Sequence, residues 1–217
     1  MEETFKFTFE DEKHLRVECS NDNGGNGIDI GGGDDDGGVY TSFNVELAGT
    51  LPTLVSQYLS ENQGVIITAL KLKGYLNGTD IKYIRELSIE DKYLSRLDIS
   101  EANIVEGGSA YCHGDNFEDW DIDYNTETNE VSNYMFYKCK SLIYVSLPTS
   151  VTSIGGSAFW GCTGLTSITI PNSVTRIEDF AFIGVPADCV IHVPSGCKEK
   201  YATAGEWKYF KTIVDDL

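Results

Sequence analysis

The most constraining feature of this sequence is a 23-residue unit that occurs three times, without a gap, between Val131 and Pro194. Phe136 recurs as Phe159 and then as Phe182, and each step is 23 residues. The same step relates further apolar, cysteine and proline positions: Val131/Ile154/Ile177, Val145/Ile168/Ile191, Leu147/Ile170/Val193, Cys139/Cys162 and Pro148/Pro171/Pro194. So many coincidences at one period indicate a repeat protein, whose copies must stack because no copy can bury its apolar face alone.

The local pattern of each copy predicts one strand and one return segment. The strand is apolar, as in Leu142-x-x-Val145-x-Leu147, and it ends at a proline that cannot donate a hydrogen bond to a neighbouring strand. We therefore predict an α/β solenoid with right-handed coils and a parallel sheet on one face. Short irregular or helical return segments connect strands that lie about 4.8 Å apart.

The segment Ser150–Pro171 fits the pattern S-V-x-x-I-G-x-x-A-F-x-x-C-x-x-L-x-x-I-x-I-P, and Ser173–Phe182 fits its first part again, with Val185 in place of the cysteine. These residues resemble the BspA-like leucine-rich repeat family, which is common among surface proteins of Bacteroidetes. The resemblance covers about residues 45–217 and leaves out the first 38. It implies a leucine-rich repeat domain at the cell surface.

The chain divides into an N-terminal segment and a repeat domain. Phe5, Phe7 and Phe9 alternate with polar residues, and a second alternating run follows, so residues 4–19 predict a β-hairpin. The expected parts are a hairpin with a flexible acidic Gly/Asp linker (1–38), an N-terminal cap with the first repeats (39–100), an acidic insertion (101–130), regular repeats (131–194) and a C-terminal cap (195–217).

We expect helices to close both ends of the solenoid, because an open end would expose the core. Thr50 and Pro52 predict the N-terminus of a first helix, with Thr50 as the capping residue. Asp80 is expected to cap a second helix, and Ser195 a short C-terminal one. The apolar residues expected to cover the core are Leu51, Leu54, Val55, Tyr58, Leu59, Ile81, Ile84, Leu87, Phe210, Ile213 and Val214.

The formal net charge of −18 is concentrated in two segments. Residues 1–38 hold 11 acidic and 3 basic residues, residues 101–130 hold 9 acidic residues and no Lys or Arg, and the remainder has 14 acidic and 13 basic residues. An acidic surface argues against binding to nucleic acid or to anionic membranes. The sequence has no apolar run of 18 residues, so we expect no membrane-spanning segment.

A metal site is considered and not adopted. Asp119, Asp121, Asp123 and Glu130 have the spacing of EF-hand ligands, but Tyr124 stands where that loop needs glycine. A solvated acidic loop over residues 115–130 is the preferred interpretation, with calcium as the alternative. The Asp34–Asp36 triplet is likewise interpreted as a solvated acidic loop, with a cation site as the alternative.

The sequence predicts neither an enzyme nor a cofactor site. His14, His113 and His192 lie in a hairpin, an acidic loop and a strand, and none belongs to a nucleophile or zinc motif. Cys139 and Cys162 are expected to be buried free thiols, with a disulfide between stacked repeats as the alternative. We therefore expect no catalytic, cofactor-binding or metal-binding residues.

A binding site is expected on the outer face of the sheet. Strand alternation directs Val145 and Leu147 inward, so Tyr144 and Ser146 face outward. Carried across the repeats, this register predicts one exposed column of Ala69, Arg96, Tyr144, Ser167 and Val190, and another of Lys71, Asp98, Ser146, Thr169 and His192. The candidate binding residues are Lys71, Arg96, Asp98, Tyr144, Ser146, Ser167, Thr169 and His192; the alternative is a sheet that is merely solvated.

Two classes of function remain. The first is a non-catalytic, adhesin-like module that binds a host or microbial surface protein or a glycan, as the family resemblance implies. The second is a structural spacer or capping component of a larger surface assembly. We expect a monomer at the cell surface or outside the cell, with a signal or lipoprotein segment already removed; a cytoplasmic protein is the alternative.

Overall fold

The structure of the 217-residue chain is a computed structural model. It describes residues 5–11, 14–19, 28–30, 39–89, 92–113, 122–199 and 210–217. For residues 5–30 only the backbone is described.

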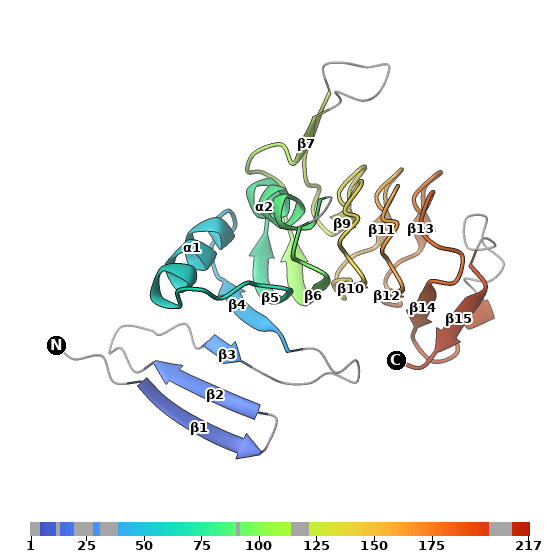
Figure 1. The fold of residues 1–217 in the computed structure, drawn as a ribbon. Helices are drawn as coiled ribbons and strands as arrows, with labels where there is room; N and C mark the ends of the chain where they lie inside the picture. The colour runs from blue at the N-terminus through green and yellow to red at the C-terminus, as the bar shows by residue number, and fades with distance from the viewer. Residues whose placement is uncertain are drawn as a thin grey trace.

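The largest sheet has ten strands, and every neighbouring pair from β4 onward is parallel (Figure 1). These parallel strands are β4 (Thr41–Val45), β5 (Ala69–Leu76), β6 (Arg96–Ile104), β10 (Tyr144–Ser146), β12 (Ser167–Thr169), β14 (Val190–Val193) and β15 (Thr212–Asp215). The strands that precede them pair antiparallel: β1 (Phe5–Asp11), β2 (His14–Cys19) and β3 (Ile28–Ile30). The mostly parallel sheet, with helices and irregular segments between its strands, is a leucine-rich-repeat-like α/β arrangement.

The return segments form a second, smaller parallel sheet. Its strands are β9 (Glu130–Val131), β11 (Ser153–Ile154) and β13 (Arg176–Ile177), each 23 residues from the next. Two further strands, β7 (Cys112–His113) and β8 (Asp123–Tyr124), pair antiparallel within the acidic insertion. The described helices are α1 (Leu51–Glu61) and α2 (Gly78–Ser88).

The register of the large sheet aligns equivalent residues of successive repeats. Val145 pairs with Ile168, and Ile168 pairs with Ile191. Leu97 and Leu70 extend this row toward the N-terminus, and all five side chains are fully buried. Leu147, Ile170 and Val193 are buried as well. The prediction of parallel strands with these residues inside is therefore confirmed.

The return segments bury a stack of phenylalanine rings. Phe136 and Phe182 lie on either side of Phe159, with ring centroids 5.2 and 5.3 Å away and interplanar angles of 22° and 1°. Cys139 and Cys162 are buried in the same core as free thiols, which confirms the prediction for these two residues.

Each return turn contains two residues with left-handed backbone, and both positions recur every 23 residues. The first position is Tyr134, Ser157 and Phe180, with φ of 59°, 56° and 65°. The second is Lys138, Gly161 and Gly184, with φ of 56°, 73° and 82°. Glycine adopts this conformation without steric cost, whereas side chains with a Cβ do so at a penalty. Only the second position uses glycine.

The carboxylate of Asp80 caps the N-termini of both helices, whereas the sequence predicted that Asp80 caps the second helix only. Thr50 precedes α1 as predicted, but its hydroxyl donates to the Leu47 carbonyl and makes no capping bond. The N-cap of α2 is Asn77, not Asp80. Asp80 is fully buried, and its carboxylate accepts hydrogen bonds from the backbone N–H groups of Gly49, Leu51 and Asn77. One carboxylate therefore satisfies donors at the N-termini of both helices.

The acidic insertion (101–130) contributes to the core, and Thr126 is buried although residues 115–130 were interpreted as a solvated loop. Strand β6 continues to Ile104, which is fully buried, and Tyr111 and Thr126 are 4% and 3% exposed. The Tyr111 hydroxyl donates to the Asn133 carbonyl over 2.6 Å, which ties the insertion to the first regular repeat. Burial raises the pKa of Tyr111 well above its usual range.

The C-terminal residues add a strand that the sequence analysis did not predict. Strand β15 pairs in parallel with β14, and Phe210 and Ile213 are buried as expected, while Val214 is half-buried. The short helix predicted to start at Ser195 is described only at Lys198 and Glu199, because residues 200–209 lie outside the described residues. No described helix is long and apolar enough to cross a membrane.

Candidate functional site

The outer face of the large sheet carries the two predicted columns in register. Arg96 pairs with Tyr144, Tyr144 with Ser167, and Ser167 with Val190. Ala69 extends this column on β5. The second column runs in the same way through Lys71, Asp98, Ser146, Thr169 and His192.

The exposure of these columns differs from the prediction. Ala69, Asp98 and Ser146 are buried, with 2%, 4% and 5% of their surface exposed, and the other members are half-buried. Parallel strands lie so close together that neighbouring side chains cover one another. Asp98 and Ser146 are therefore corrected from surface residues to supporting ones.

Polar contacts fix the side chains of the first column. The guanidinium carbon of Arg96 lies 5.1 Å from the ring centroid of Tyr144, a cation–π geometry. The Tyr144 hydroxyl is 3.4 Å from the Thr169 hydroxyl of the second column. Tyr144 is consequently held on two sides by residues of the neighbouring strands.

Contacts between ionisable side chains occupy both ends of the second column. The Lys71 ammonium lies 3.3 Å from Asp98 and 3.4 Å from Glu101. His192 Nδ1 lies 2.9 Å from a carboxylate oxygen of Asp216, a residue that follows β15. The face thus offers cationic and aromatic groups whose geometry is set by neighbouring side chains.

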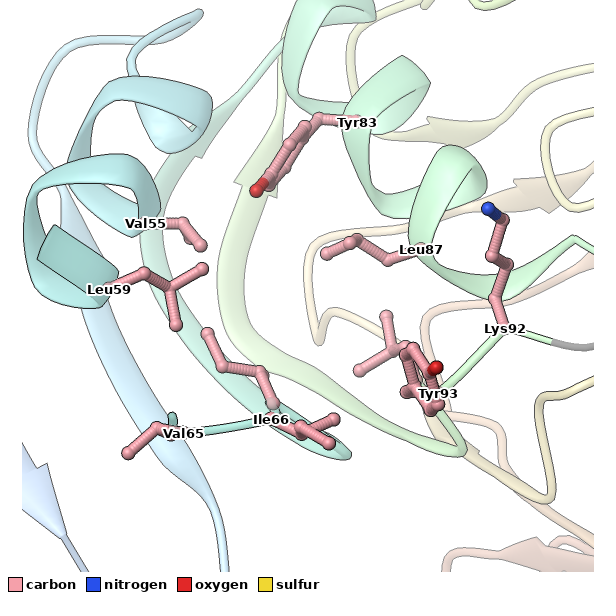
Figure 2. Close-up of a pocket in the computed structure, with 10 residues that line it drawn as sticks. Val55, Leu59, Val65, Ile66, Tyr83, Leu87, Lys92 and Tyr93 are labelled. Carbon is pink, nitrogen blue, oxygen red and sulfur yellow. The ribbon is translucent and has the colours of Figure 1, made fainter. Parts of the chain in front are cut away.

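A second candidate surface, not predicted from the sequence, is a concave groove between the two helices (Figure 2). This helix groove has a volume of about 230 Å³ and is lined by Val55, Leu59, Val65, Ile66, Ile67, Tyr83, Leu87, Lys92, Tyr93 and Leu94. Val65, Ile66 and Tyr93 are 41%, 59% and 65% exposed. Burial, followed by the charge of Glu86, raises the pKa of Tyr83. The apolar run Val65–Ile67 after α1 is the sequence signal that could have indicated it.

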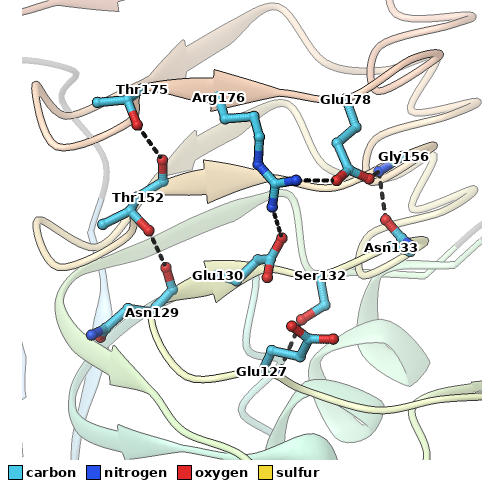
Figure 3. Close-up of polar contacts among 10 residues, drawn as sticks. All are labelled: Glu127, Asn129, Glu130, Ser132, Asn133, Thr152, Gly156, Thr175, Arg176 and Glu178. Carbon is cyan, nitrogen blue, oxygen red and sulfur yellow. Dashed lines mark hydrogen bonds and ion pairs between the residues drawn. The ribbon is translucent and has the colours of Figure 1, made fainter.

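A polar network covers the small sheet (Figure 3). Arg176 bridges Glu178 at 2.7 Å and Glu130 at 3.3 Å, so it links the first and third regular repeats. The Gly156 N–H donates to Asn133 and Glu178. All of these contacts except the Arg176–Glu178 pair join residues of different copies, which is a structural role.

Threonine hydroxyls add to this network along one line of the stack. Thr152 donates to the Asn129 carbonyl, and Thr175 donates to the Thr152 carbonyl, each over 3.4 Å (Figure 3). A hydrogen bond that the protonated Glu127 carboxyl donates to Glu130, together with the charge of Glu130, raises the pKa of Glu127 at the edge of the network. Glu127 is exposed and Glu130 is half-buried beside Arg176, so we assign this pair of carboxyls no catalytic role.

The carboxylates once considered for calcium do not converge in the described part of the chain. Asp119 and Asp121 lie outside the described residues. Asp123 pairs with His113 at 2.7 Å, and Glu130 pairs with Arg176. The described residues contain no group of three or more His, Cys, Asp or Glu side chains arranged to hold a metal ion.

The repeated parallel strands and the register of equivalent side chains define a leucine-rich repeat protein. A family model described as "BspA type Leucine rich repeat region (6 copies)" matches residues 129–202. This part of the chain therefore belongs to the BspA-type leucine-rich repeat family, a class of generally non-catalytic protein-interaction modules. A search of curated proteins found no match.

Proposed function

We propose that this chain is a non-catalytic, adhesin-like module of the cell surface that binds a partner protein through the outer face of its large sheet. In this proposal the chain is a right-handed solenoid with both ends covered by helical segments and an N-terminal hairpin beside the first end. The family supports the general role in protein interaction. The surface location and the use of the sheet are our inference.

One observation carries the choice of the sheet face. Arg96, Tyr144 and Thr169 come from three adjacent strands and are held together by a cation–π contact and a hydroxyl contact. Side chains already fixed in the free protein lose little conformational entropy on binding. Tyrosine and arginine are also the residue types enriched among binding hot spots. Lys71 and His192 extend the same face as a polar rim.

An array of extracellular-matrix proteins, microbial surface proteins and glycans, probed with the whole chain, tests this function. Tyr144→Ala and Arg96→Ala should each weaken binding to a captured protein by more than about 1 kcal/mol, the usual threshold of an interface residue that matters. Tyr93→Ala is the matched control, because it removes an equally large aromatic side chain from the helix groove. Binding that is unaffected by both sheet-face substitutions would refute this site.

The surface location has its own test. A tagged chain expressed in the producing cell should be labelled by a membrane-impermeant reagent and removed by protease added to intact cells. A chain protected from both reagents would be intracellular. A chain that is exposed, binds no array member and assembles with its own surface complex would favour the structural spacer.

A further inference from the structure

The return turns carry a line of aromatic rings on the outside of the repeat stack. Ring centroids are 4.6 Å apart for Tyr124 and Tyr134, 5.6 Å for Tyr134 and Tyr137, and 6.4 Å for Tyr137 and Trp160. Phe180 follows, 6.4 Å from Trp160. We call these five residues the aromatic ladder. It crosses three regular repeats and does not line the helix groove.

The ladder becomes more exposed toward its C-terminal end. Tyr137 is 7% exposed, Trp160 is half-buried, and Phe180 is 56% exposed. Ile183 occupies the position equivalent to Tyr137 and Trp160, and it is 40% exposed. Tyr134 is half-buried. The ladder therefore combines buried rings that support it with exposed apolar groups.

Both the backbone conformation and the exposure of Phe180 are energetically unfavourable for a phenylalanine in a free, solvated chain. Its φ of 65° is in the left-handed region, which is rare for a bulky residue. More than half of its surface also faces solvent. Glycine or asparagine would suit such a turn position better. Because the left-handed φ also occurs at Tyr134 and Ser157, the feature that singles out Phe180 is its exposed ring at a turn position that favours smaller residues, and this ring points to a contact.

The charge around the ladder limits what it can contact. Residues 131–194 contain three basic and three acidic residues, so this segment is neutral although the whole chain carries −18: Lys138, Lys140, Arg176, Glu178, Asp179 and Asp188. An anionic polymer would gain no attraction from this segment and would be repelled by the chain as a whole.

We propose that the aromatic ladder is a second binding surface, distinct from the sheet face, and that it binds a neutral polysaccharide. The C–H faces of pyranose rings stack on aromatic side chains without requiring charge. A ligand of repeating sugar units also suits rings that recur along a stack of repeats. Exposed Phe180 and half-buried Trp160 supply the stacking surfaces, and buried Tyr137 packs against Trp160.

Native affinity electrophoresis with soluble β-glucan, xylan and galactomannan tests the proposal, with alginate and heparin as acidic probes. At least one neutral polysaccharide should retard the whole chain and change its tryptophan emission. Phe180→Asn should weaken this binding about tenfold. Asparagine suits left-handed backbone, so the variant should still fold. Trp160→Phe should abolish the emission change while binding persists.

Two matched controls separate this surface from others. Tyr93→Asn removes an exposed aromatic ring from the helix groove, and Tyr144→Ala alters the sheet face; neither should affect polysaccharide binding. The proposal is overturned if no neutral polysaccharide binds, if acidic ones bind equally, or if Phe180→Asn binds like the unaltered chain. Sedimentation provides a further check, because self-association that depends on Phe180 without polysaccharide binding would assign the ladder to a second copy of the chain.

Discussion

Arg96 lies over the ring of Tyr144, although the two residues belong to strands separated in the sequence by the whole acidic insertion. Parallel pairing of β6 with β10 brings them together. Tyr144 is thus both part of the proposed binding face and part of the contacts between repeats. Its substitution should therefore affect stability as well as binding.

We expect Tyr144→Ala to lower the free energy of unfolding by about 1 kcal/mol, since a cation–π contact at such a site contributes about 0.5–1 kcal/mol and half-buried ring area is lost as well. A freely exposed tyrosine would cost less than about 0.5 kcal/mol. Urea denaturation measures the difference, and Tyr144→Phe, which keeps the ring, is the control. An unchanged midpoint for Tyr144→Ala would mean that the ring is free in solution.

The phenylalanine stack should be the most sensitive part of the core. Phe159 is fully buried between two other rings, so Phe159→Ala should cost about 3–5 kcal/mol, as other emptied aromatic sites do. Phe180→Ala is a matched control, because the same atoms are removed from an exposed side chain. Equal losses of denaturation midpoint in the two variants would contradict the buried stack.

The left-handed turn position at Lys138 should accept glycine with a gain in stability. Left-handed backbone costs a residue with a Cβ about 1–2 kcal/mol, while the Lys138 ammonium over the Tyr137 ring returns about 0.5–1 kcal/mol. Lys138→Gly should therefore stabilise the chain by about 0.5 kcal/mol. The reciprocal variant Gly161→Ala should destabilise it. Differential scanning calorimetry distinguishes these signs, and a lower melting temperature for Lys138→Gly would refute the argument.

Asp80 should be the most costly buried charge to remove. Its carboxylate accepts three backbone N–H bonds at the ends of two helices, and hydrogen bonds to a charged group contribute about 1.5–3 kcal/mol each. Asp80→Ala leaves buried donors unpaired and should cost at least about 3 kcal/mol. Far-ultraviolet circular dichroism during urea denaturation reports the change, with the exposed Glu86→Ala on the same helix as the control.

The buried thiols should make stability depend on alkaline pH. Burial raises the pKa of Cys189 to about 12 and also raises the pKa of Cys139 and Cys162. Unfolded thiols ionise near pH 8.5, so the unfolded state binds fewer protons above that value. This contribution to stability is complete below about pH 8.5 and is lost as the pH rises toward 12.

A disulfide reagent at pH 8 provides the matching chemical test. The three thiols should react slowly in the native chain and quickly in urea. Cys189→Ala should reduce the loss of stability between pH 9 and 11, measured as the denaturation midpoint. Rapid reaction of these thiols in the native chain would show that they are accessible.

The regular repeats were predictable because their period fixes both the register and the interior. The alignment of Val145, Ile168 and Ile191 follows from the period alone. The burial of Asp98 does not follow from the period. Alternation along a strand predicts which face of the sheet a side chain is on, but it does not predict how far neighbouring side chains cover it. The contribution of Tyr111 to the core was missed because Tyr111 is a single aromatic residue in a Gly-rich segment without apolar periodicity.

The aromatic ladder and the helix groove depend on tertiary contacts that no local pattern specifies. Tyr137 and Trp160 were visible as equivalent positions, yet their partner Phe180 stands at a different position of its turn, the first left-handed one. The groove requires the packing of α1 beside α2. The residues of the groove share no common spacing, whereas the ladder residues of the repeats occupy two positions that each recur at the 23-residue period.

The constant step between β10, β12 and β14 has a consequence for how such a chain changes over generations. Because Tyr144 meets Ser167 in the same way that Ser167 meets Val190, a duplicated or deleted copy joins its neighbours without a new kind of junction. Each such event would move the C-terminal strand by about 4.8 Å relative to the N-terminal helices. Gain or loss of repeats during evolution therefore changes the length of the molecule in equal steps.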